Sequence, residues 1–244
     1  MAKETIRLCV WSGPRNISTA LMYSFAQRAD TTVHDEPLYA HYLVNSAAKS
    51  YHPGADEIVA AMENDGARVV NEFILGPHPT PVAYFKQMTH HLVELDLSFM
   101  AHTVNVMLTR HPRDMLPSYA KQVSAPTLAD VGYKKHVELV EYLRALGQDP
   151  PVLDSAATLR NPRAVLKTLC ARVGIGFDEA MLTWPAGARK EDGVWAPYWY
   201  DSVHRSTGFQ PYRPKTDPFP AHLEPLLAEC LPYYEELARD AIRV

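Results

Sequence analysis

The sequence predicts an α/β protein of three layers, in which helices cover both faces of a central parallel sheet. Short apolar runs of strand length recur along the chain. Stretches with helical spacing separate them, and polar turns mark where several of the runs end. Strands and helices that alternate in this way form a parallel sheet, because each connecting helix returns the chain to the same end of the sheet. A chain of 244 residues is long enough for one such domain, and we expect it to span residues 1–244.

The first apolar run leads through a polar turn into a helix. Ile6–Trp11 is the predicted strand, residues 12–16 (SGPRN) form the turn, and Ile17–Arg28 is the predicted helix. Unpaired N–H groups of a first helical turn, together with the helix dipole, attract an anion to such a turn. Arg15 adds a guanidinium that holds two phosphate or sulfate oxygens at once. The turn therefore predicts an anion site, although it lacks the second glycine and the lysine of a Walker A loop.

The elements that follow alternate between strand and helix. The predicted strands are Thr31–His34, Arg68–Glu72, Val82–Lys86, Val104–Leu108 and Pro150–Leu153. The predicted helices are Leu38–Lys49, Asp56–Asn64, Thr89–Phe99, Pro112–Gln122, Leu128–Leu146, Pro162–Val173 and His222–Ile242. Pro112 and Pro162 each stand at the first position of a predicted helix, where the missing N–H of proline has no partner to lose. Gly174 directly follows the predicted helix Pro162–Val173.

Residues 183–220 differ from the rest of the chain. They are rich in Pro, Trp, Tyr, Gly and charge and have no helical or strand periodicity. Long irregular segments are uncommon in compact domains unless they bind a ligand or act as a lid. We therefore expect this loop to cover the functional site.

A second polar cluster stands at the end of the predicted strand Val104–Leu108. Arg110 follows the strand, and Ser118 lies eight residues later, about two turns into the next predicted helix. Both side chains suit an anionic ligand. A surface salt bridge between Arg110 and Asp114 is the alternative interpretation.

The two segments together resemble the sulfotransferase family, whose members have a P-loop NTPase-like fold and transfer a sulfuryl group from 3′-phosphoadenosine 5′-phosphosulfate (PAPS). The resemblance implies PAPS as the donor and a small-molecule acceptor with a hydroxyl or an amine. It implies that the phosphosulfate is bound by Ser12, Gly13, Pro14, Arg15, Asn16, Ser18 and Thr19. It implies that Arg110 and Ser118 bind the 3′-phosphate, so that the two segments must share one cleft.

The irregular segment carries a partial match to a further motif of the same family. Sulfotransferases often have an Arg-Lys-Gly loop that covers the 3′-phosphate, and Arg189 and Lys190 match its first two positions. Glu191 replaces the first glycine of that loop. A second cluster of hydroxyl, cation and glycine follows at His204–Phe209 and is the alternative.

The resemblance leaves the catalytic base open. Many members have a His two residues after a Lys at a strand end; Lys86 matches the Lys, but Met88 stands in place of the His. His90 and His91 follow closely. Glu36 is the other candidate, because it follows a short strand and some bacterial members use a carboxylate. We expect catalytic roles for Arg15 and for Glu36 or His90, with His91 as a further alternative.

Composition limits the possible partners and the location of the protein. A formal net charge of −4 and a pI near 6.2 argue against a general binder of nucleic acid or of membrane surfaces. The three cysteines lie far apart and no metal-binding spacing is present, so no metal is expected. Neither a signal segment nor a run of membrane-spanning length occurs, which favours a cytoplasmic enzyme. The oligomeric state stays open, and a homo-oligomer is one option.

Three other functions fit the same residues. A nucleotide or small-molecule kinase with a degenerate P-loop is one, although such kinases need Mg²⁺ and usually a P-loop lysine. A nucleotide-binding regulator without catalysis is the second. The third is a different small-molecule transferase or hydrolase with an anion pocket.

Overall fold

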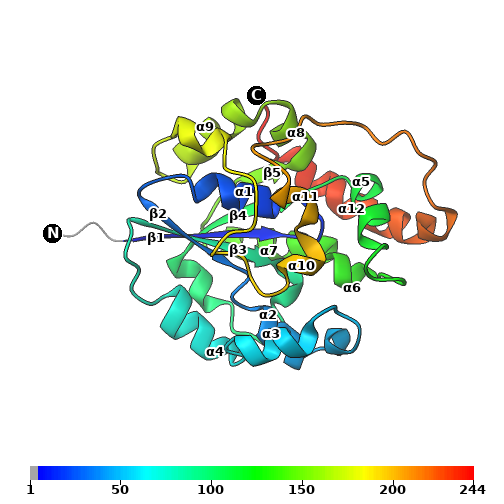
Figure 1. Cartoon of the computed structure of the whole chain (residues 1–244), viewed down its shortest axis with the longest axis horizontal. Helices are drawn as coiled ribbons and strands as arrows, with labels where there is room; N and C mark the ends of the chain where they lie inside the picture. Colours follow the sequence, from blue (N-terminus) through cyan, green and yellow to red (C-terminus); the bar gives the residue numbers. More distant parts are fainter. Residues whose placement is uncertain (1–4) are drawn as a thin grey trace.

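A computed structural model of the chain describes residues 5–244 and has five parallel strands at its centre (Figure 1). The strands are β1 (Ile6–Ser12), β2 (Thr31–Asp35), β3 (Val82–Met88), β4 (Val104–Thr109) and β5 (Val152–Asp154). Their order is β2-β3-β1-β4-β5, and β1 pairs with β3 on one side and with β4 on the other. The predicted parallel sheet is thus confirmed.

Helices connect the strands and close the chain. The α-helices are α1 (Ser18–Phe25), α2 (Tyr39–Val44), α3 (Ala55–Ala61), α4 (Gly66–Arg68), α5 (Pro112–Tyr119), α6 (Leu128–Val131), α7 (Tyr133–Ala145), α8 (Ser155–Arg160), α9 (Pro162–Arg172), α10 (Ala196–Trp199), α11 (Asp201–His204) and α12 (Glu224–Arg239). The 3₁₀ helices are η1 (Ala47–Ser50), η3 (Thr89–His91), η4 (Ser98–His102), η5 (Glu179–Leu182) and η6 (Ala221–Leu223), and η2 (Val69–Ile74) is a π-helix. Within residues 5–244, no helix has the length and apolar character needed to cross a membrane.

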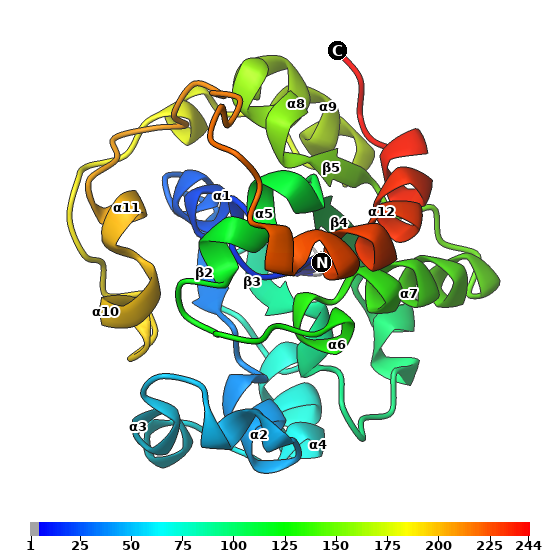
Figure 2. The same cartoon turned by 90° about the vertical axis from the view of Figure 1, so that its right-hand side faces the viewer.

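Two apolar cores lie on the two faces of the sheet, because alternate side chains of each strand point to opposite sides. On one face, strand residues such as Leu8, Val10 and Tyr84 pack against α1 and α9. On the other face, Trp11 and Phe85 pack with η2, η4 and α7. Figure 2 shows α1, α8 and α9 on one side of the sheet and α2, α3 and α4 on the opposite side. The three predicted layers are therefore present.

Several predicted elements are wrong in type or extent, and three of them are informative. The strand predicted at Arg68–Glu72 is helical, because the Asp65 carboxylate caps a helix there by accepting hydrogen bonds from two backbone N–H groups. The helix predicted at Leu128–Leu146 is divided into α6 and α7 at Gly132, whose φ is +72°. The helix predicted at Thr89–Phe99 is replaced by the two short 3₁₀ helices η3 and η4.

Residues 183–220 contain more regular structure than their composition indicates. Helices α10 and α11 lie within them, and each is four residues long, which is too short for an apolar periodicity to appear in the sequence. The backbone at Thr183 also pairs with Gly208 in an isolated antiparallel bridge. The segment is therefore a folded strap and not an open loop.

The order of the strands fixes where a ligand is expected. The chain builds β2 and β3 on one side of β1 and then crosses to place β4 on the other side. In open parallel sheets, ligands bind at the carboxyl ends of the strands where the direction of winding changes. The end of β1, between the ends of β3 and β4, is that point.

Candidate active site

A cavity of about 370 Å³ lies at this point. The turn between β1 and α1 contributes Pro14, Arg15, Asn16 and Ile17, and the first turn of α1 contributes Ser18 and Thr19. The ends of β2, β3 and β4 contribute Glu36, Lys86, Met88, His90, His91 and Arg110, and α5 contributes Ser118 and Tyr119. The strap over residues 183–220 contributes Trp195, Trp199, Tyr200, Ser206, Gly208 and Phe209, among others. Side chains from four strand ends and the strap therefore meet in one space.

The two predicted anion-binding segments form one hydrogen-bonded unit in this cavity. The Arg110 guanidinium donates through Nη1 to the backbone oxygen of Arg15 at 2.8 Å. Arg15 in turn donates through Nε to Ser118 Oγ at 3.1 Å and through Nη1 to the Trp199 carbonyl at 3.0 Å. Arg15 has φ of +54°, a conformation that an L-residue seldom adopts, and these contacts hold it there. Segments about a hundred residues apart thus converge as a single cleft requires.

The first turn of α1 is open to the cavity. Ile17 occupies its N-cap and has no side-chain acceptor, so no side chain caps the first amides of the helix. The hydroxyls of Ser18 and Thr19 line the same space. Asn16 is held by a hydrogen bond from Nδ2 to the Leu108 carbonyl at 3.0 Å. Such an arrangement suits an anion, because free amides of a first helical turn and the helix dipole attract negative charge.

Ser12 and Gly13 support the turn from behind and do not line the cavity. The Ser12 hydroxyl, which is fully buried, donates to the Gln87 carbonyl at 3.3 Å. A Cβ atom on Gly13 would stand 2.7 Å from the Val131 carbonyl oxygen, so only glycine fits between the turn and α6. Both residues therefore shape the turn through packing.

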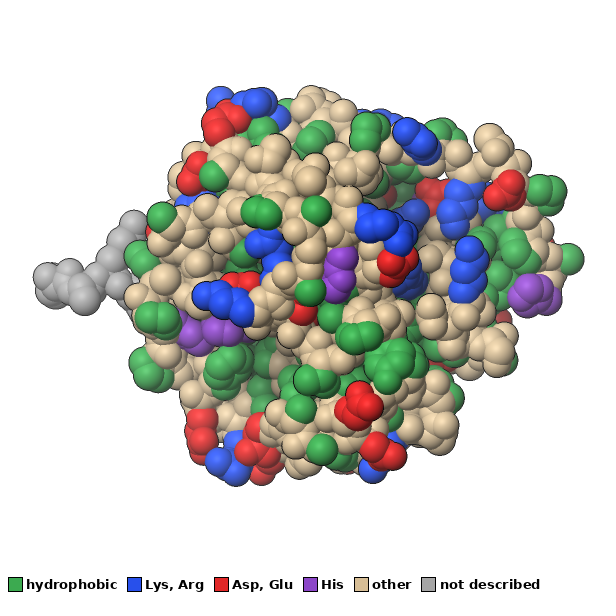
Figure 3. All heavy atoms as spheres, in the orientation of Figure 1, with side chains coloured by type: hydrophobic (Ala, Val, Ile, Leu, Met, Phe, Trp, Pro, Cys, Tyr) green, Lys and Arg blue, Asp and Glu red, His purple; other side chains and the backbone are tan. Residues whose placement is uncertain are grey.

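Positive charge is concentrated beside the turn. Burial lowers the pKa of Arg15, and the charge of Arg110 lowers it further. Burial also lowers the pKa of Lys215, followed in effect by the charge of Arg110, and Lys121 and Arg15 act in the same direction. Figure 3 shows Lys and Arg side chains gathered on this face of a protein whose net charge is negative. The site is a local cationic pocket, which favours a ligand with several negative charges.

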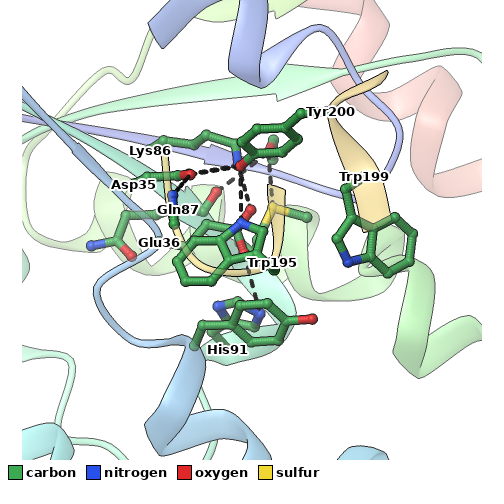
Figure 4. A network of polar contacts seen from close by, with 12 residues as sticks. Asp35, Glu36, Lys86, Gln87, His91, Trp195, Trp199 and Tyr200 are labelled. Atoms are coloured by element: carbon green, nitrogen blue, oxygen red, sulfur yellow. Dashed lines mark hydrogen bonds and ion pairs between the residues drawn. The ribbon is translucent and has the colours of Figure 1, made fainter. Parts of the chain in front are cut away.

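A buried network of opposite charges stands at the ends of β2 and β3 (Figure 4). Lys86 Nζ lies 2.8 Å from Asp35 Oδ1, donates to Glu36 Oε1, and lies 2.6 Å from the Tyr200 hydroxyl. Burial alone would lower the pKa of Lys86, but the charges of Asp35 and Glu36 outweigh it and raise that pKa. One ammonium therefore faces two carboxyl groups.

The two carboxylates differ in how well they are satisfied. Asp35 accepts hydrogen bonds from Lys86, from the Tyr200 hydroxyl and from the Gly193 N–H. Glu36 accepts one, at Oε1; its Oε2 accepts none from residues 5–244 and lies 3.9 Å from His91 Nε2. Burial raises the pKa of Glu36, Lys86 opposes this, and Asp35 adds to it. Glu36, with φ of +43°, thus lines the cavity with one oxygen open to a proton.

His90 and His91 line the cavity as neutral rings. Burial is the main cause that lowers the pKa of His90 to about 3, and it lowers the pKa of His91 well below the ordinary value. Rings with such low pKa values accept protons weakly at neutral pH. Glu36 is therefore a better candidate for the catalytic base than His90 or His91.

Arg189 and Lys190 are not brought to this cavity. The Arg189 guanidinium stacks 4.5 Å over the Tyr23 ring, and Lys190 is exposed at a second cavity beside β2. The alternative cluster at His204–Phe209 is the one that reaches the site, through Ser206, Gly208 and Phe209. The backbone of Gly208 pairs with that of Thr183, and this pairing connects the His204–Phe209 cluster to the start of the strap.

Sequence reasoning missed several residues of the cavity. Tyr39 and His52 line it, and Lys215 lies near enough to Arg110 and Arg15 for their charges to lower its pKa. Each lies in a segment whose place in space depends on tertiary packing, and no spacing in the sequence marks them. Within residues 5–244, no group of three or more His, Cys, Asp or Glu side chains is arranged to hold a metal ion.

A family model described as a sulfotransferase domain matches residues 6–241. Two Arabidopsis thaliana proteins are similar in sequence over 228 residues, which is 93% of this chain: branched-chain-amino-acid aminotransferase-like protein 2 at 38% identity and protein 1 at 40%. The match covers 40% of the length of each, so this chain corresponds to less than half of those proteins.

Solved structures have the same fold at low sequence identity. The sulfotransferase domain from the Synechococcus PCC 7002 olefin synthase matches with a TM-score of 0.60 at 15% identity, over 98% of this chain and 96% of that one. A sulfotransferase from Alicyclobacillus acidocaldarius matches with 0.56 at 11% identity, over 98% of both chains. These likenesses confirm the predicted three-layer, P-loop NTPase-like α/β fold.

Proposed function

The chain belongs to the sulfotransferase domain family, and from this premise we propose that it transfers a sulfuryl group from PAPS to a hydroxyl or amine of a small molecule. One observation carries the proposal: Arg15 and Arg110 line one cavity and are joined by a hydrogen bond of 2.8 Å. PAPS carries negative charge at both ends of its ribose, and a pair of guanidiniums in one cleft suits that charge distribution.

The donor site follows from the position of the cations. Arg15, the open amides of α1 and the hydroxyls of Ser18 and Thr19 suit the phosphosulfate, while Arg110 and Ser118 suit the 3′-phosphate. Lys215 adds charge beside Arg110. Leu159 and Phe209 line the same cavity and offer an apolar surface to the adenine.

The proposed transfer needs a proton acceptor and stabilisation of the leaving group. The acceptor oxygen or nitrogen forms a bond to sulfur while the bond from sulfur to the phosphate oxygen breaks, and the acceptor proton passes to Glu36 Oε2. Arg15 and the α1 amides stabilise the charge that develops on the departing 3′,5′-diphosphoadenosine. Lys86 keeps Glu36 oriented through its ion pair at Oε1.

Calorimetric titration with 3′,5′-diphosphoadenosine tests the donor site. We expect Arg110→Ala to weaken this binding about a hundredfold, because a hydrogen bond to a charged group contributes about 1.5–3 kcal/mol. The loss for adenosine 5′-monophosphate, which has no 3′-phosphate, should be much smaller. Arg113→Ala is the matched control, since Arg113 is half-exposed beyond the cavity. Equal losses for the two nucleotides would exclude Arg110 as the 3′-phosphate residue.

A thermal-shift comparison separates this proposal from a kinase. PAPS or 3′,5′-diphosphoadenosine should raise the melting temperature, because a ligand that binds only the folded state stabilises it. ATP with Mg²⁺ should have no such effect at the same concentration. The opposite ranking would favour a nucleotide kinase, and binding of PAPS without any transfer would favour a regulator.

A further inference from the structure

Two consecutive residues at the end of β2 direct their carboxyl groups at the same ammonium (Figure 4). Asp35 is the last residue of the strand and lies directly opposite Lys86 in the register of β2 and β3. Consecutive side chains of an extended strand point to opposite faces, so an extended Glu36 would point away from Lys86. Its φ of +43° ends the extended conformation, and its N–H donates to the Lys86 carbonyl at 2.9 Å. The backbone therefore turns Glu36 to meet Lys86 beside Asp35.

Only one of the two carboxyl groups reaches the cavity that holds Arg15 and Arg110. Glu36 lines this cavity, whereas Asp35 does not, and the Asp35 side chain is 1% exposed. Its oxygens accept from Lys86 at 2.8 Å, from the Tyr200 hydroxyl at 2.7 Å and from the Gly193 N–H at 3.0 Å. Asp35 is thus placed to act on the reaction through its charge and through Lys86, and not by touching a substrate.

Two charges control the proton affinity of Glu36. The titratable groups close enough to interact with it within residues 5–244 come from five elements of the fold: Asp35 on β2, Lys86 on β3, His91 on η3, Tyr39 on α2 and Tyr200 on the strap. Burial keeps the last three uncharged at neutral pH, because it lowers the pKa of the histidine and raises those of both tyrosines. The remaining charges are those of Lys86 and Asp35.

These two charges act on Glu36 in opposite directions. A carboxylate paired alone with a buried ammonium is a weak base, because the positive charge stabilises the ionised form. A second carboxylate on the same ammonium offsets that charge. Burial raises the pKa of Glu36, Lys86 opposes this rise, and Asp35 adds to it.

We propose that Asp35 is a positioning residue that shares the Lys86 ammonium with Glu36 and so keeps Glu36 Oε2 an effective proton acceptor. This inference rests on the sulfotransferase function proposed above. Lys86 orients Glu36 through Oε1, and Asp35 offsets the charge that would weaken the base. When the O–H or N–H bond of the acceptor breaks and its proton binds Glu36 Oε2, Lys86 and Asp35 remain as a balanced pair. No uncompensated charge is then left in a buried place, where it is destabilising.

Asp35→Asn removes the charge and keeps an oxygen that can accept a hydrogen bond. The full charge of Lys86 then acts on Glu36, so the acid limb of kcat should move to lower pH by about one unit. Above the limb, kcat should fall by up to about tenfold, because a weaker base takes the proton less readily. The affinity for 3′,5′-diphosphoadenosine should not change. Asp35→Ser removes the same charge with a smaller side chain and should move the limb in the same direction.

Asp30→Asn is the matched control. Asp30 also pairs with a cation, Arg28, at 2.8 Å, but it does not line the cavity, and its variant should keep the original limb. Lys86→Met should move the limb the opposite way, to higher pH, because two carboxyl groups then face each other without the ammonium. A purely structural role of Asp35 would lower kcat without moving the limb, and that result would overturn the proposal.

Infrared difference spectroscopy over the same pH range follows the Glu36 carboxyl without turnover. The protonated-carboxyl band that Glu36→Gln lacks should appear at lower pH in Asp35→Asn than in the unmodified protein, and at higher pH in Lys86→Met. A band that moves in this way while PAPS supports no transfer would overturn the proposed function and leave the sharing of Lys86 supported. A band that stays in place in both Asp35 variants would overturn the sharing, whether or not sulfuryl is transferred.

Discussion

Two adjacent carboxylates, Asp35 and Glu36, have different surroundings at the end of β2. Asp35 is fixed by three donors, one of them the Tyr200 hydroxyl from the strap. Glu36 is turned toward the cavity by a backbone with φ of +43° and keeps one oxygen without a hydrogen bond from residues 5–244. A backbone conformation of this kind is destabilising unless its surroundings hold it, and it is often found at functional positions. Glu36 is accordingly the carboxylate that we assign as the base.

Glu36→Gln is expected to lower kcat by at least about a hundredfold, because an amide does not accept the acceptor proton. The affinity for 3′,5′-diphosphoadenosine should not change, since Glu36 is not among the groups proposed to bind the nucleotide. Steady-state kinetics and calorimetry measure the two quantities. Glu191→Gln, at the second cavity beside β2, is the control.

The pH dependence of kcat gives a separate test of Glu36. The base acts as a carboxylate, so activity is present above its pKa and is lost as the pH falls through it. Because burial raises this pKa above the ordinary 4.5, the acid limb of kcat should lie above pH 4.5. Glu36→Gln should lack that limb. A limb that persists in Glu36→Gln would assign the proton transfer to another group.

At the scale of elements, the strap over residues 183–220 is held down by contacts with the strands and α1. Tyr200 reaches Asp35 and Lys86 through its hydroxyl, and the Trp195 Nε1–H donates to the same hydroxyl at 3.0 Å. Asp192 accepts a hydrogen bond of 2.6 Å from the Tyr23 hydroxyl on α1. The strap is thus held by these buried polar contacts together with apolar side chains such as Trp184 and Trp195, which pack into the cores.

Tyr200→Phe should make the strap easier to open. The variant loses the hydroxyl bonds to Asp35 and Lys86, and limited proteolysis within residues 183–220 should become about tenfold faster if the loss is near 1.4 kcal/mol. Tyr198→Phe, a half-exposed neighbour on α10, should cleave at the original rate. Equal cleavage rates in the two variants would show that Tyr200 does not anchor the strap.

The break between α6 and α7 is set by Gly132. Its φ is +72°, and a Cβ atom there would stand 2.7 Å from Thr89 Oγ1 on η3. Gly174 after α9 has a similar φ of +76° but no neighbour within 4 Å of such a Cβ. A comparison of substitutions at the two glycines therefore separates the effect of backbone strain from that of steric conflict with a neighbour.

Gly132→Ala should lower the free energy of unfolding by more than Gly174→Ala does. Alanine in the left-handed region costs about 1–2 kcal/mol at either position, and the contact with Thr89 adds to this only at Gly132. Urea denaturation measures both values. Equal losses would mean that η3 moves aside freely and that the break is not fixed by packing.

At the scale of the whole molecule, the protein buries several histidines as neutral rings. His52, His90 and His136 have pKa values of about 4, 3 and 4, with burial as the main cause in each. An unfolded chain protonates them near pH 6.5, so it binds more protons than the folded chain below that pH. Stability is therefore complete above about pH 6.5 and falls as the pH drops toward 4.

Unfolding midpoints in urea should fall between pH 7 and pH 5. Each of the three histidines contributes a loss of ~2 kcal/mol over this range, because its unfolded state gains a proton that the folded state refuses. Glu36 acts in the opposite direction, since its raised pKa favours the folded state at low pH, but it is one group against three. A midpoint that stays constant from pH 7 to pH 5 would contradict this account.

The sequence by itself determined the layers of the fold and identified the two segments that we propose to bind the donor. Strand periodicity and the strand–turn–helix pattern at Ile6–Phe25 are local properties, and local spacing is enough to identify them. Arg15, Ser18, Arg110 and Ser118 all line the cavity for the same reason, because each stands at a fixed offset from the end of a strand.

Only the tertiary structure decided which other side chains meet them. Gly132 divides a helix whose apolar spacing is continuous in the sequence, and Asp65 caps a helix where short apolar spacing favoured a strand. Arg189 and Lys190 match a motif yet lie outside the cavity. His52 and Lys215 match no motif, yet His52 lines the cavity and Lys215 lies near its arginines. Burial, charge and hydrogen bonding among these groups arise from packing between distant segments, and such packing leaves no periodic mark along the chain.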